Sequence, residues 1–365
     1  MKKILFILFT SICIYSCTTT GYKIDGNVDN KALNGTKIFI KERINRVWIS
    51  LDSTVIENGK FSFKGVADTA KIANIVYEFP QDNKVRQAFV LEIGNITVNI
   101  DSTGFMVIKG TAQNNLLQSY QESKKAFNKK SDAFYSANKD SLSTFEQKLA
   151  FSKKEKIFNK EEADIDKKFV TENINTVAGT YVFTSTFYGF STAEKDSIIL
   201  KFNEITKQIP RIKEIIAATE KEKKVAVGNQ FVDFRMPDTN GDSLSLSGLV
   251  GKTDYVLIDF WASWCPDCIA SIPEIKSLYT MYKGPRFEIL GVSLDDDKSA
   301  WKNAISSYQL DWKHVSDLKR WECAGSKAYA VNFTPTTVLI DKKGKIVGRN
   351  LSFSEIANLL SRKTH

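Results

Sequence analysis

The sequence predicts a multidomain protein with an N-terminal antiparallel β-sandwich, a central α-helical segment and a C-terminal α/β domain. Three observations predict this order. Short runs rich in β-branched and aromatic residues, separated by turn signals, occupy residues 22–110. Amphipathic helical spacings follow up to residue 224, and strand and helix patterns alternate from residue 225 onward. A chain of 365 residues is long enough for several domains, each with its own core.

Residues 1–16 read as a signal peptide that ends beside a lipidation site at Cys17. Two lysines precede an apolar run, Ile4 to Tyr15, which is shorter than the roughly 20 residues that span a bilayer. The run ends in Ile14-Tyr15-Ser16-Cys17, which resembles a bacterial lipobox and implies cleavage before Cys17 and a lipid on its thiol. An ordinary signal peptide or an uncleaved anchor is the alternative. No acidic run follows Cys17, which favours a lipid anchor in the cell envelope that faces the periplasm.

The predicted β-sandwich covers residues 17–110. Val47–Leu51 and Ile96–Ile100 are typical of its strands, and we expect about six to eight of them. Asn58-Gly59 separates two short apolar runs, and this dipeptide favours a type I′ turn within a β-hairpin.

The predicted helical segment covers residues 111–224. Phe127 and Phe134 lie seven residues apart, as on one face of a helix, and we expect them in a core. Pro210 suits the first turn of a further helix. The charged run Glu220–Lys224 reads as an exposed linker to the next domain.

The charge balance is basic, with 51 Lys and Arg against 42 Asp and Glu. Between Glu122 and Lys168 the lysines alternate with acidic residues, which is typical of solvated helices. No basic stripe with interleaved aromatic residues is present, so we expect no nucleic-acid partner.

The predicted α/β domain covers residues 225–365. Tyr255–Phe260 and Phe287–Val292 read as buried strands, and a helical pattern follows each of them. Thr336–Ile340 begins a hairpin that a last helix follows. This order predicts a central mixed sheet flanked by helices.

The chain contains five cysteines. Cys13 would leave with the signal peptide and Cys17 would carry the lipid, which leaves Cys265, Cys268 and Cys323. So few cysteines exclude a small scaffold held together by disulfides. The close pair Cys265 and Cys268 is therefore predicted to be chemically active.

A metal or haem role for this pair is not expected. A structural zinc would need two further ligands, and only Cys323, His314 and His365 remain. Ile269 stands where a haem-attachment motif would need His. We therefore expect no metal and no cofactor beyond the redox-active disulfide of the pair.

Cys265 is expected at a turn from strand to helix, where backbone N–H groups and the helix dipole favour a thiolate. Thiolate is the species that attacks a disulfide. Cys268, one turn further on, can resolve the mixed disulfide. Pro266 removes one N–H donor and Asp267 adds a negative charge, so the motif does not predict the reduction potential.

The segment Val256–Cys265 resembles the active-site strand of thioredoxin almost residue for residue. Pro273 matches the proline that kinks the active-site helix of that family. Thr334 and Pro335 match its cis-proline loop, and the resemblance implies a cis bond that turns the Thr334 backbone toward an extended substrate. Asp259 occupies the position of the buried acid that relays the proton of the resolving cysteine. A strand-end carboxylate exposed to water is the alternative for Asp259.

Taken together, these inferences predict two groups of site residues. The catalytic residues are Cys265, Cys268 and Asp259. The predicted substrate contacts are Trp264, Pro266, Asp267, Thr334 and Pro335.

Val227–Phe231 and Gly241–Leu246 resemble the N-terminal hairpin of the TlpA/ResA-type envelope thioredoxins and of the related peroxiredoxins. Members dedicated to cytochrome c maturation often carry Glu where this chain has Ser271, so general disulfide reduction is favoured. The peroxiredoxin pattern needs Pro and Thr or Ser where this chain has Ile258 and Ala262, which excludes a peroxidase.

The predicted function is a lipid-anchored, periplasm-facing thiol-disulfide oxidoreductase that reduces protein disulfides with electrons from an upstream donor in the envelope. Residues 22–110 resemble an uncharacterised domain that precedes thioredoxin modules in bacterial envelope lipoproteins. The alternative is an envelope binding or scaffold module whose thioredoxin domain senses redox state or holds a partner. Cys323 is expected to be a buried, inert thiol, with a third redox cysteine as the alternative.

Overall fold

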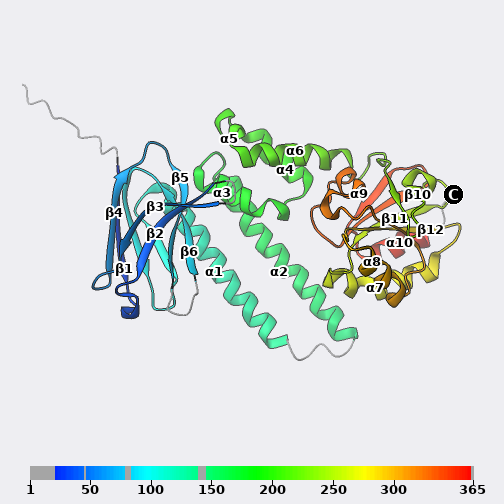
Figure 1. Cartoon of the computed structure of the whole chain (residues 1–365), viewed down its shortest axis with the longest axis horizontal. Coiled ribbons are helices and arrows are strands. Elements are labelled where there is room, and N and C mark those ends of the chain that lie inside the picture. Colours follow the sequence, from blue (N-terminus) through cyan, green and yellow to red (C-terminus); the bar gives the residue numbers. More distant parts are fainter. Residues whose placement is uncertain (1–20, 45–46, 79–83, 139–144, 363–365) are drawn as a thin grey trace, which may run out of the picture. The chain divides into compact units, whose positions relative to one another are not determined.

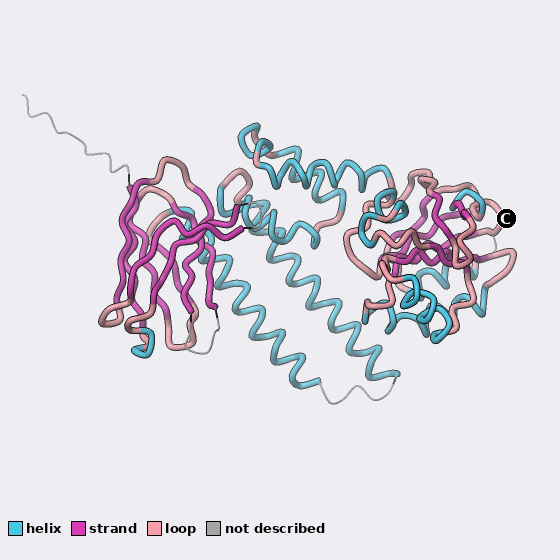
Figure 2. Tube along the Cα trace, viewed as in Figure 1, coloured by secondary structure: helices cyan, strands magenta, loops and turns pink. Residues whose placement is uncertain are grey.

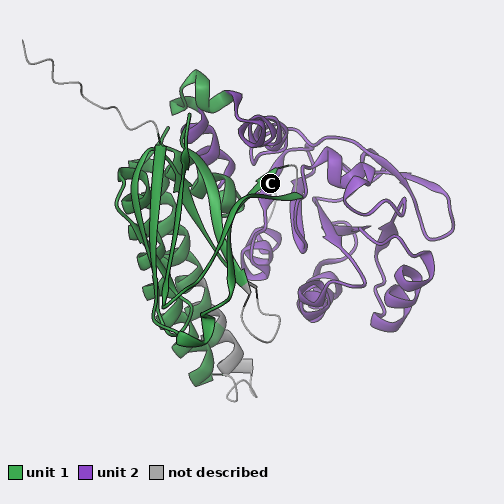
Figure 3. Ribbon diagram, turned by 60° about the vertical axis from the view of Figure 1, so that its left-hand side comes forward, with its two compact units in different colours: residues 1–190, 200–207 green, residues 191–199, 208–365 purple. Residues whose placement is uncertain are grey.

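The computed structural model describes residues 21–44, 47–78, 84–138 and 145–362. Cys17, the predicted signal peptide and His365 lie outside these ranges. The chain forms two compact units, residues 1–190 with 200–207 and residues 191–199 with 208–365 (Figure 3). The predicted helical segment therefore contributes to both units, which are described separately below.

The first unit begins with two four-stranded sheets, in the orders β4-β1-β7-β8 and β3-β2-β5-β6 (Figures 1 and 2). The strands are β1 (Gly21–Val28), β2 (Lys37–Ile44), β3 (Val47–Val55), β4 (Lys60–Val66), β5 (Lys71–Glu78), β6 (Lys84–Leu91), β7 (Gly94–Ile100) and β8 (Met106–Lys109). Alternate residues face inward, such as Ile24 and Val98 from one sheet and Ile38 and Ile75 from the other, and they share one core. The predicted β-rich N-terminal region is confirmed.

Two details of the predicted sandwich are wrong. β1 and β7 run parallel, so the first sheet is not wholly antiparallel. Asn58 and Gly59 do form a tight turn with positive φ at both residues, closed by two hydrogen bonds between Glu57 and Lys60. The flanking strands nevertheless pair with β2 and β1 in different sheets. The residues of the turn determine its conformation. Which sheet each flanking strand joins depends instead on strands that are distant in the sequence.

Three helices follow in the first unit: α1 (Ala112–Asn138), α2 (Phe145–Glu172) and α3 (Val177–Thr186). Helix α1 packs against β6 and β8, which are edge strands of the two sheets. The buried Asn114 side chain bonds both backbone groups of Val90, and Gln118 accepts the N–H of Ile108. These amides satisfy backbone groups that an edge strand would otherwise leave exposed.

The second unit includes most of α4 (Thr192–Lys201) and all of α6 (Pro210–Lys224). The short α5 (Glu204–Gln208) lies between these helices in the chain but belongs to the first unit except for Gln208. Pro210 begins α6, as predicted. The predicted linker Glu220–Lys224 is wrong, because these residues form the last turns of α6. Glu222 is buried there and pairs with the buried Lys195 of α4 at 3.0 Å. A charged run thus becomes part of a packed helix because a distant residue neutralises its buried member.

The remainder of the second unit is a five-stranded mixed sheet in the order β13-β12-β11-β14-β15. Its strands are β11 (Tyr255–Trp261), β12 (Phe287–Ser293), β13 (Lys313–Val315), β14 (Thr336–Asp341) and β15 (Ile346–Arg349). Its helices are α7 (Pro266–Tyr282), α8 (Lys298–Tyr308), α9 (Ala324–Ala328) and α10 (Phe353–Ser361), and β9 (Arg235–Pro237) pairs with β10 (Ser243–Ser245). The predicted mixed sheet is confirmed. None of the helices in the described ranges has the length and apolar character that crossing a bilayer requires.

Candidate active site

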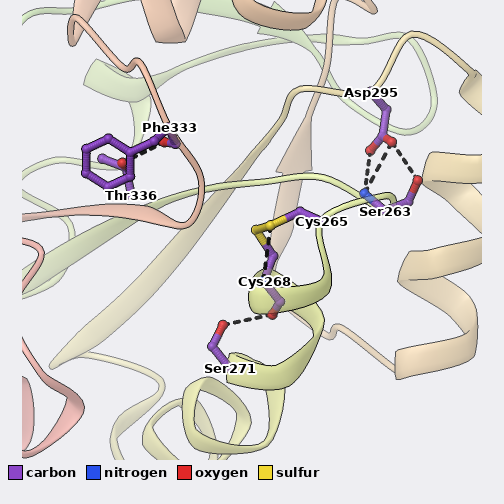
Figure 4. The surroundings of a disulfide bond; sticks show 7 residues. All are labelled: Ser263, Cys265, Cys268, Ser271, Asp295, Phe333 and Thr336. Atoms are coloured by element: carbon purple, nitrogen blue, oxygen red, sulfur yellow. Dashed lines mark hydrogen bonds between the residues drawn. A yellow bond between two sulfur atoms is a disulfide. The ribbon is translucent and has the colours of Figure 1, made fainter. Parts of the chain in front are cut away.

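The two close cysteines lie where β11 passes into α7. Cys265 is the N-cap of α7, and its Sγ accepts a hydrogen bond from the backbone N–H of Cys268 at 3.2 Å. Pro266 begins the helix, where its missing N–H leaves no hydrogen bond unmade. The two sulfurs are joined in a disulfide (Figure 4). Pro273 lies inside α7, at the position expected for the kink.

Asp259 lies on β11, the strand that leads into this turn. It is flanked in register by Gly291 of β12 and Thr337 of β14, so it occupies the centre of the sheet. The residue is 5% exposed, which agrees with the predicted burial and excludes a strand-end carboxylate open to water. Burial disfavours the charged carboxylate and raises the pKa of Asp259 to about 7. A group with this pKa can accept or return a proton near neutral pH.

The loop before β14 carries the other predicted site residues. The bond between Thr334 and Pro335 is cis, as predicted. The loop is closed by a hydrogen bond of 2.8 Å from Thr336 Oγ1 to the carbonyl oxygen of Phe333, whose side chain is half-exposed (Figure 4).

A buried carboxylate that the sequence did not single out supports the turn before Cys265. Asp295 follows β12 and is almost fully buried. It accepts hydrogen bonds from the Ser263 Oγ at 2.6 Å and from the Ser263 backbone N–H at 3.2 Å (Figure 4). It also accepts one from the Ser293 Oγ at 2.7 Å. These bonds fix the chain two residues ahead of the reactive cysteine.

Comparisons with known proteins agree with this geometry. The family described as Redoxin matches residues 226–359, and a domain of unknown function, DUF4369, matches residues 22–117. The thiol-disulfide oxidoreductase ResA of Bacillus cereus is 33% identical over 126 residues, which cover 34% of this chain and 70% of that protein. ResA of Bacillus subtilis is also 33% identical and is covered over 68% of its length. The chain belongs to the ResA family of thiol-disulfide oxidoreductases.

The solved structures to which part of this chain is similar include two from Bacteroides. A thiol-disulfide oxidoreductase from Bacteroides fragilis is 33% identical, with a TM-score of 0.34, and the match covers 36% of this chain and 99% of that one. The thioredoxin domain of a thiol-disulfide oxidoreductase from Bacteroides vulgatus is 29% identical, with a TM-score of 0.35 and coverages of 37% and 99%. The Redoxin match and the ResA relatives show that the chain is a thioredoxin-like oxidoreductase of the TlpA/ResA type with an additional N-terminal domain.

A second tryptophan contacts the tryptophan that directly precedes Cys265 in this ResA-type domain. The rings of Trp264 and Trp321 meet edge to face with centroids 6.3 Å apart. Trp321 belongs to a short 3-10 turn, Arg320–Glu322, and no local sequence pattern indicates that its ring would contact Trp264. The contact joins residues that are far apart in the chain, so local patterns cannot predict it.

Among the described residues, the second unit holds one further cysteine, Cys323, and one histidine, His314. Cys323 is fully buried and free, which confirms the expected burial, and burial raises the pKa of its thiol. His314 is buried on β13 between Trp261 and Trp312, and burial lowers its pKa to about 3. In the described part of the chain, no group of three or more His, Cys, Asp or Glu side chains could hold a metal ion.

Proposed function

We propose that this oxidoreductase reduces disulfides in protein substrates through Cys265 and Cys268. The observation that carries the proposal is the position of Cys265 as the N-cap of α7, with its Sγ accepting the Cys268 N–H. After reduction, the same N–H group and the helix dipole stabilise a negative charge on this sulfur. Cys265 is thereby the attacking thiolate of the pair.

The exchange proceeds in two displacements. The Cys265 thiolate attacks one sulfur of the substrate disulfide, forms a mixed disulfide and releases the other sulfur as a thiolate. Cys268 loses its proton to Asp259 and attacks the Cys265 sulfur. The second substrate sulfur leaves, and the enzyme pair becomes the disulfide. The substrate gains two electrons, which an upstream thiol donor in the envelope restores to the enzyme, and no other cofactor is needed.

Substrate contacts are proposed for the residues around the pair. Trp264, Pro266 and Asp267 flank Cys265 directly. The backbone of Thr334, before Pro335, would pair with the extended chain on either side of the substrate cysteine.

The proposed location is the periplasmic face of an envelope membrane, with a lipid on Cys17. The lipobox-like sequence Ile14-Tyr15-Ser16-Cys17 supports this proposal. Metabolic labelling with palmitate tests it. Labelling should disappear in the Cys17→Ala variant, and persistent labelling of that variant would contradict the anchor.

The reductase proposal is tested with the full chain. We expect the wild type to reduce insulin disulfides with dithiothreitol as the donor, and the Cys265→Ser variant to be inactive. The reduction potential of the pair, measured by equilibration with glutathione, decides the direction of exchange. Absence of insulin reduction by the wild type, or full activity of the variant, would overturn the proposal.

One observation favours binding as a second function. The edge strand β3 exposes Val47, Trp48, Ile49 and Leu51 to solvent, on both faces of the strand. Such an apolar edge is typical of a surface that receives a partner. A chain with Cys265→Ser and Cys268→Ser that restores growth to a deletion strain would favour this binding role. Failure to restore growth would favour thiol exchange.

A further inference from the structure

Two tryptophans that contact each other remain exposed, and one of them directly precedes the reactive Cys265. Trp264 is 47% exposed and Trp321 is 38% exposed, although their rings contact each other. Trp264 directly precedes Cys265. Large aromatic side chains bury well in cores and in interfaces, so an exposed pair beside a reactive sulfur marks a contact surface.

The loop that carries Trp321 is held in a strained conformation. Leu318 and Arg320 both have positive φ values, 58° and 49°, which non-glycine residues rarely adopt. Such strain persists only where the surrounding structure fixes it.

Several contacts fix this loop. Arg320 pairs with Asp296 at 2.6 Å. The Asp317 carboxylate accepts the backbone N–H groups of Lys319 and Ala324. The Ser326 hydroxyl donates to the carbonyl oxygen of Trp321 at 2.7 Å. These contacts hold the Trp321 ring at a fixed position beside Trp264. A flexible loop could not hold the ring in one position.

An extended polypeptide could reach the two rings while its cysteine reacts with Cys265. Two residues along an extended chain span about 7 Å, and their side chains point to the same side. Trp264 is the residue next to Cys265 in the chain, and its ring contacts that of Trp321, so a side chain two positions from a substrate cysteine that reacts with Cys265 can reach the ring pair. A small disulfide without a chain on either side has no group that could do so.

We propose that Trp264 and Trp321 form an aromatic subsite that binds a bulky apolar side chain two residues from the substrate cysteine. The substrates would then be extended protein segments with apolar residues beside their disulfides. This inference rests on the proposed reduction of protein disulfides and makes Trp321 a specificity-determining residue.

The test compares three substrates: two disulfide peptides that differ only in Leu or Ser two positions from the cysteine, and oxidised glutathione. With the full chain, we expect Trp321→Ala to lower kcat/KM for the Leu peptide about tenfold, through KM, as for an aromatic contact residue. Rates with the Ser peptide and with glutathione should stay within about twofold, because the dithiol is unchanged. Trp321→Phe should retain most of the preference for Leu.

The control is Tyr308→Ala, which removes an aromatic side chain of similar exposure, 39%, at the end of α8. Circular dichroism and the thermal midpoint verify that each variant folds. An equal loss of kcat/KM on all three substrates in Trp321→Ala, or an unchanged kcat/KM for the Leu peptide, would overturn the proposed subsite. Neither result would contradict the proposed reductase activity. A wild type that reduces no peptide would overturn the proposed function itself.

Discussion

Two cysteines in the second unit begin helices in the same way. Cys265 is the N-cap of α7, and its sulfur accepts the Cys268 N–H at 3.2 Å. Cys323 is the N-cap of α9, and its sulfur accepts the Ser326 N–H at 3.3 Å. Both residues have extended backbone conformations. The residue three positions later is a cysteine in the first case and a serine in the second.

The surroundings of the two sulfurs differ more than their caps do. Cys265 retains 5% exposure beside the exposed Trp264, whereas Cys323 is 0% exposed and donates to the Ser326 hydroxyl. α7 spans 17 residues and α9 only five, so α9 offers a weaker dipole. Burial raises the pKa of Cys323 despite its cap. A cysteine at a helix N-cap is therefore not by itself a redox centre. A redox centre also needs a second thiol nearby and a sulfur that a substrate can reach.

The largest expected effect separates the two cysteines directly. Cys265→Ser should lower insulin reduction by about a thousandfold or more, because the attacking sulfur is lost. Cys323→Ser should leave the rate within about twofold. The turbidity assay for insulin reduction measures both variants. Comparable losses in both would mean that the buried thiol takes part in exchange.

The second expected effect concerns the acid on β11. Asp259→Asn removes the proposed proton acceptor and should slow the resolving step about a hundredfold near pH 7. In the wild type, this step should accelerate as the pH rises through about 7, the pKa of Asp259, and the variant should lose that inflection. Stopped-flow decay of the mixed disulfide across this pH range measures the step.

The same substitution has a signed effect on stability. Burial raises the pKa of Asp259 from 3.8 to about 7. Its contribution to the free energy of unfolding is therefore fully present below pH 4 and is lost as the pH rises through 7. Asp259→Asn should therefore raise the unfolding free energy of the oxidised chain at pH 8 by about 3–4 kcal/mol. Denaturant unfolding at pH 8 and at pH 4 measures this difference. A more stable variant with unchanged kinetics would show that Asp259 is buried but relays no proton.

The local sequence predicts the reactive pair well, since the residues that define it are contiguous. The apolar strand Tyr255–Trp261, the capping Cys265 and the helix after it each follow from nearby residues. The same reasoning places a turn at Asn58-Gly59 and a helix start at Pro210.

The failures share one physical cause, which is that the deciding partner is distant in the chain. The Ser263 hydroxyl donates to Asp295, which lies 32 residues away in the chain. Many other carboxylates could have accepted this hydrogen bond, so the sequence near Ser263 does not identify the acceptor. Glu222 is buried because Lys195 neutralises it, and no residue near Glu222 in the sequence indicates that pairing. The approach of Trp321 to Trp264 likewise depends on how the loop before α9 folds.

The third expected effect compares two adjacent carboxylates that follow β12. Asp295→Ala leaves the buried Ser293 hydroxyl and the partly buried Ser263 hydroxyl without their acceptor and should lower the unfolding free energy by about 2–3 kcal/mol. Asp296→Ala removes an exposed ion pair with Arg320 and should hardly shift Tm. Thermal unfolding measures both. Equal shifts would mean that the Asp295 hydrogen bonds add no more than a surface pair does.

The smallest expected effect on activity tests whether access separates the two capped cysteines. Ser326→Cys gives the Cys323 site the same two-thiol spacing as the reactive pair, and the Ser326 Oγ already lies 3.2 Å from the Cys323 sulfur. A second disulfide should therefore form on oxidation. The variant should then have two fewer free thiols in denaturant than the same variant in which only the Cys265–Cys268 disulfide has formed. Insulin reduction should change by less than about twofold, because a fully buried sulfur cannot meet a protein disulfide. The decisive variant combines Ser326→Cys with Cys265→Ser. If it reduces insulin, the cap and the spacing suffice for exchange, and burial is not what keeps Cys323 inert.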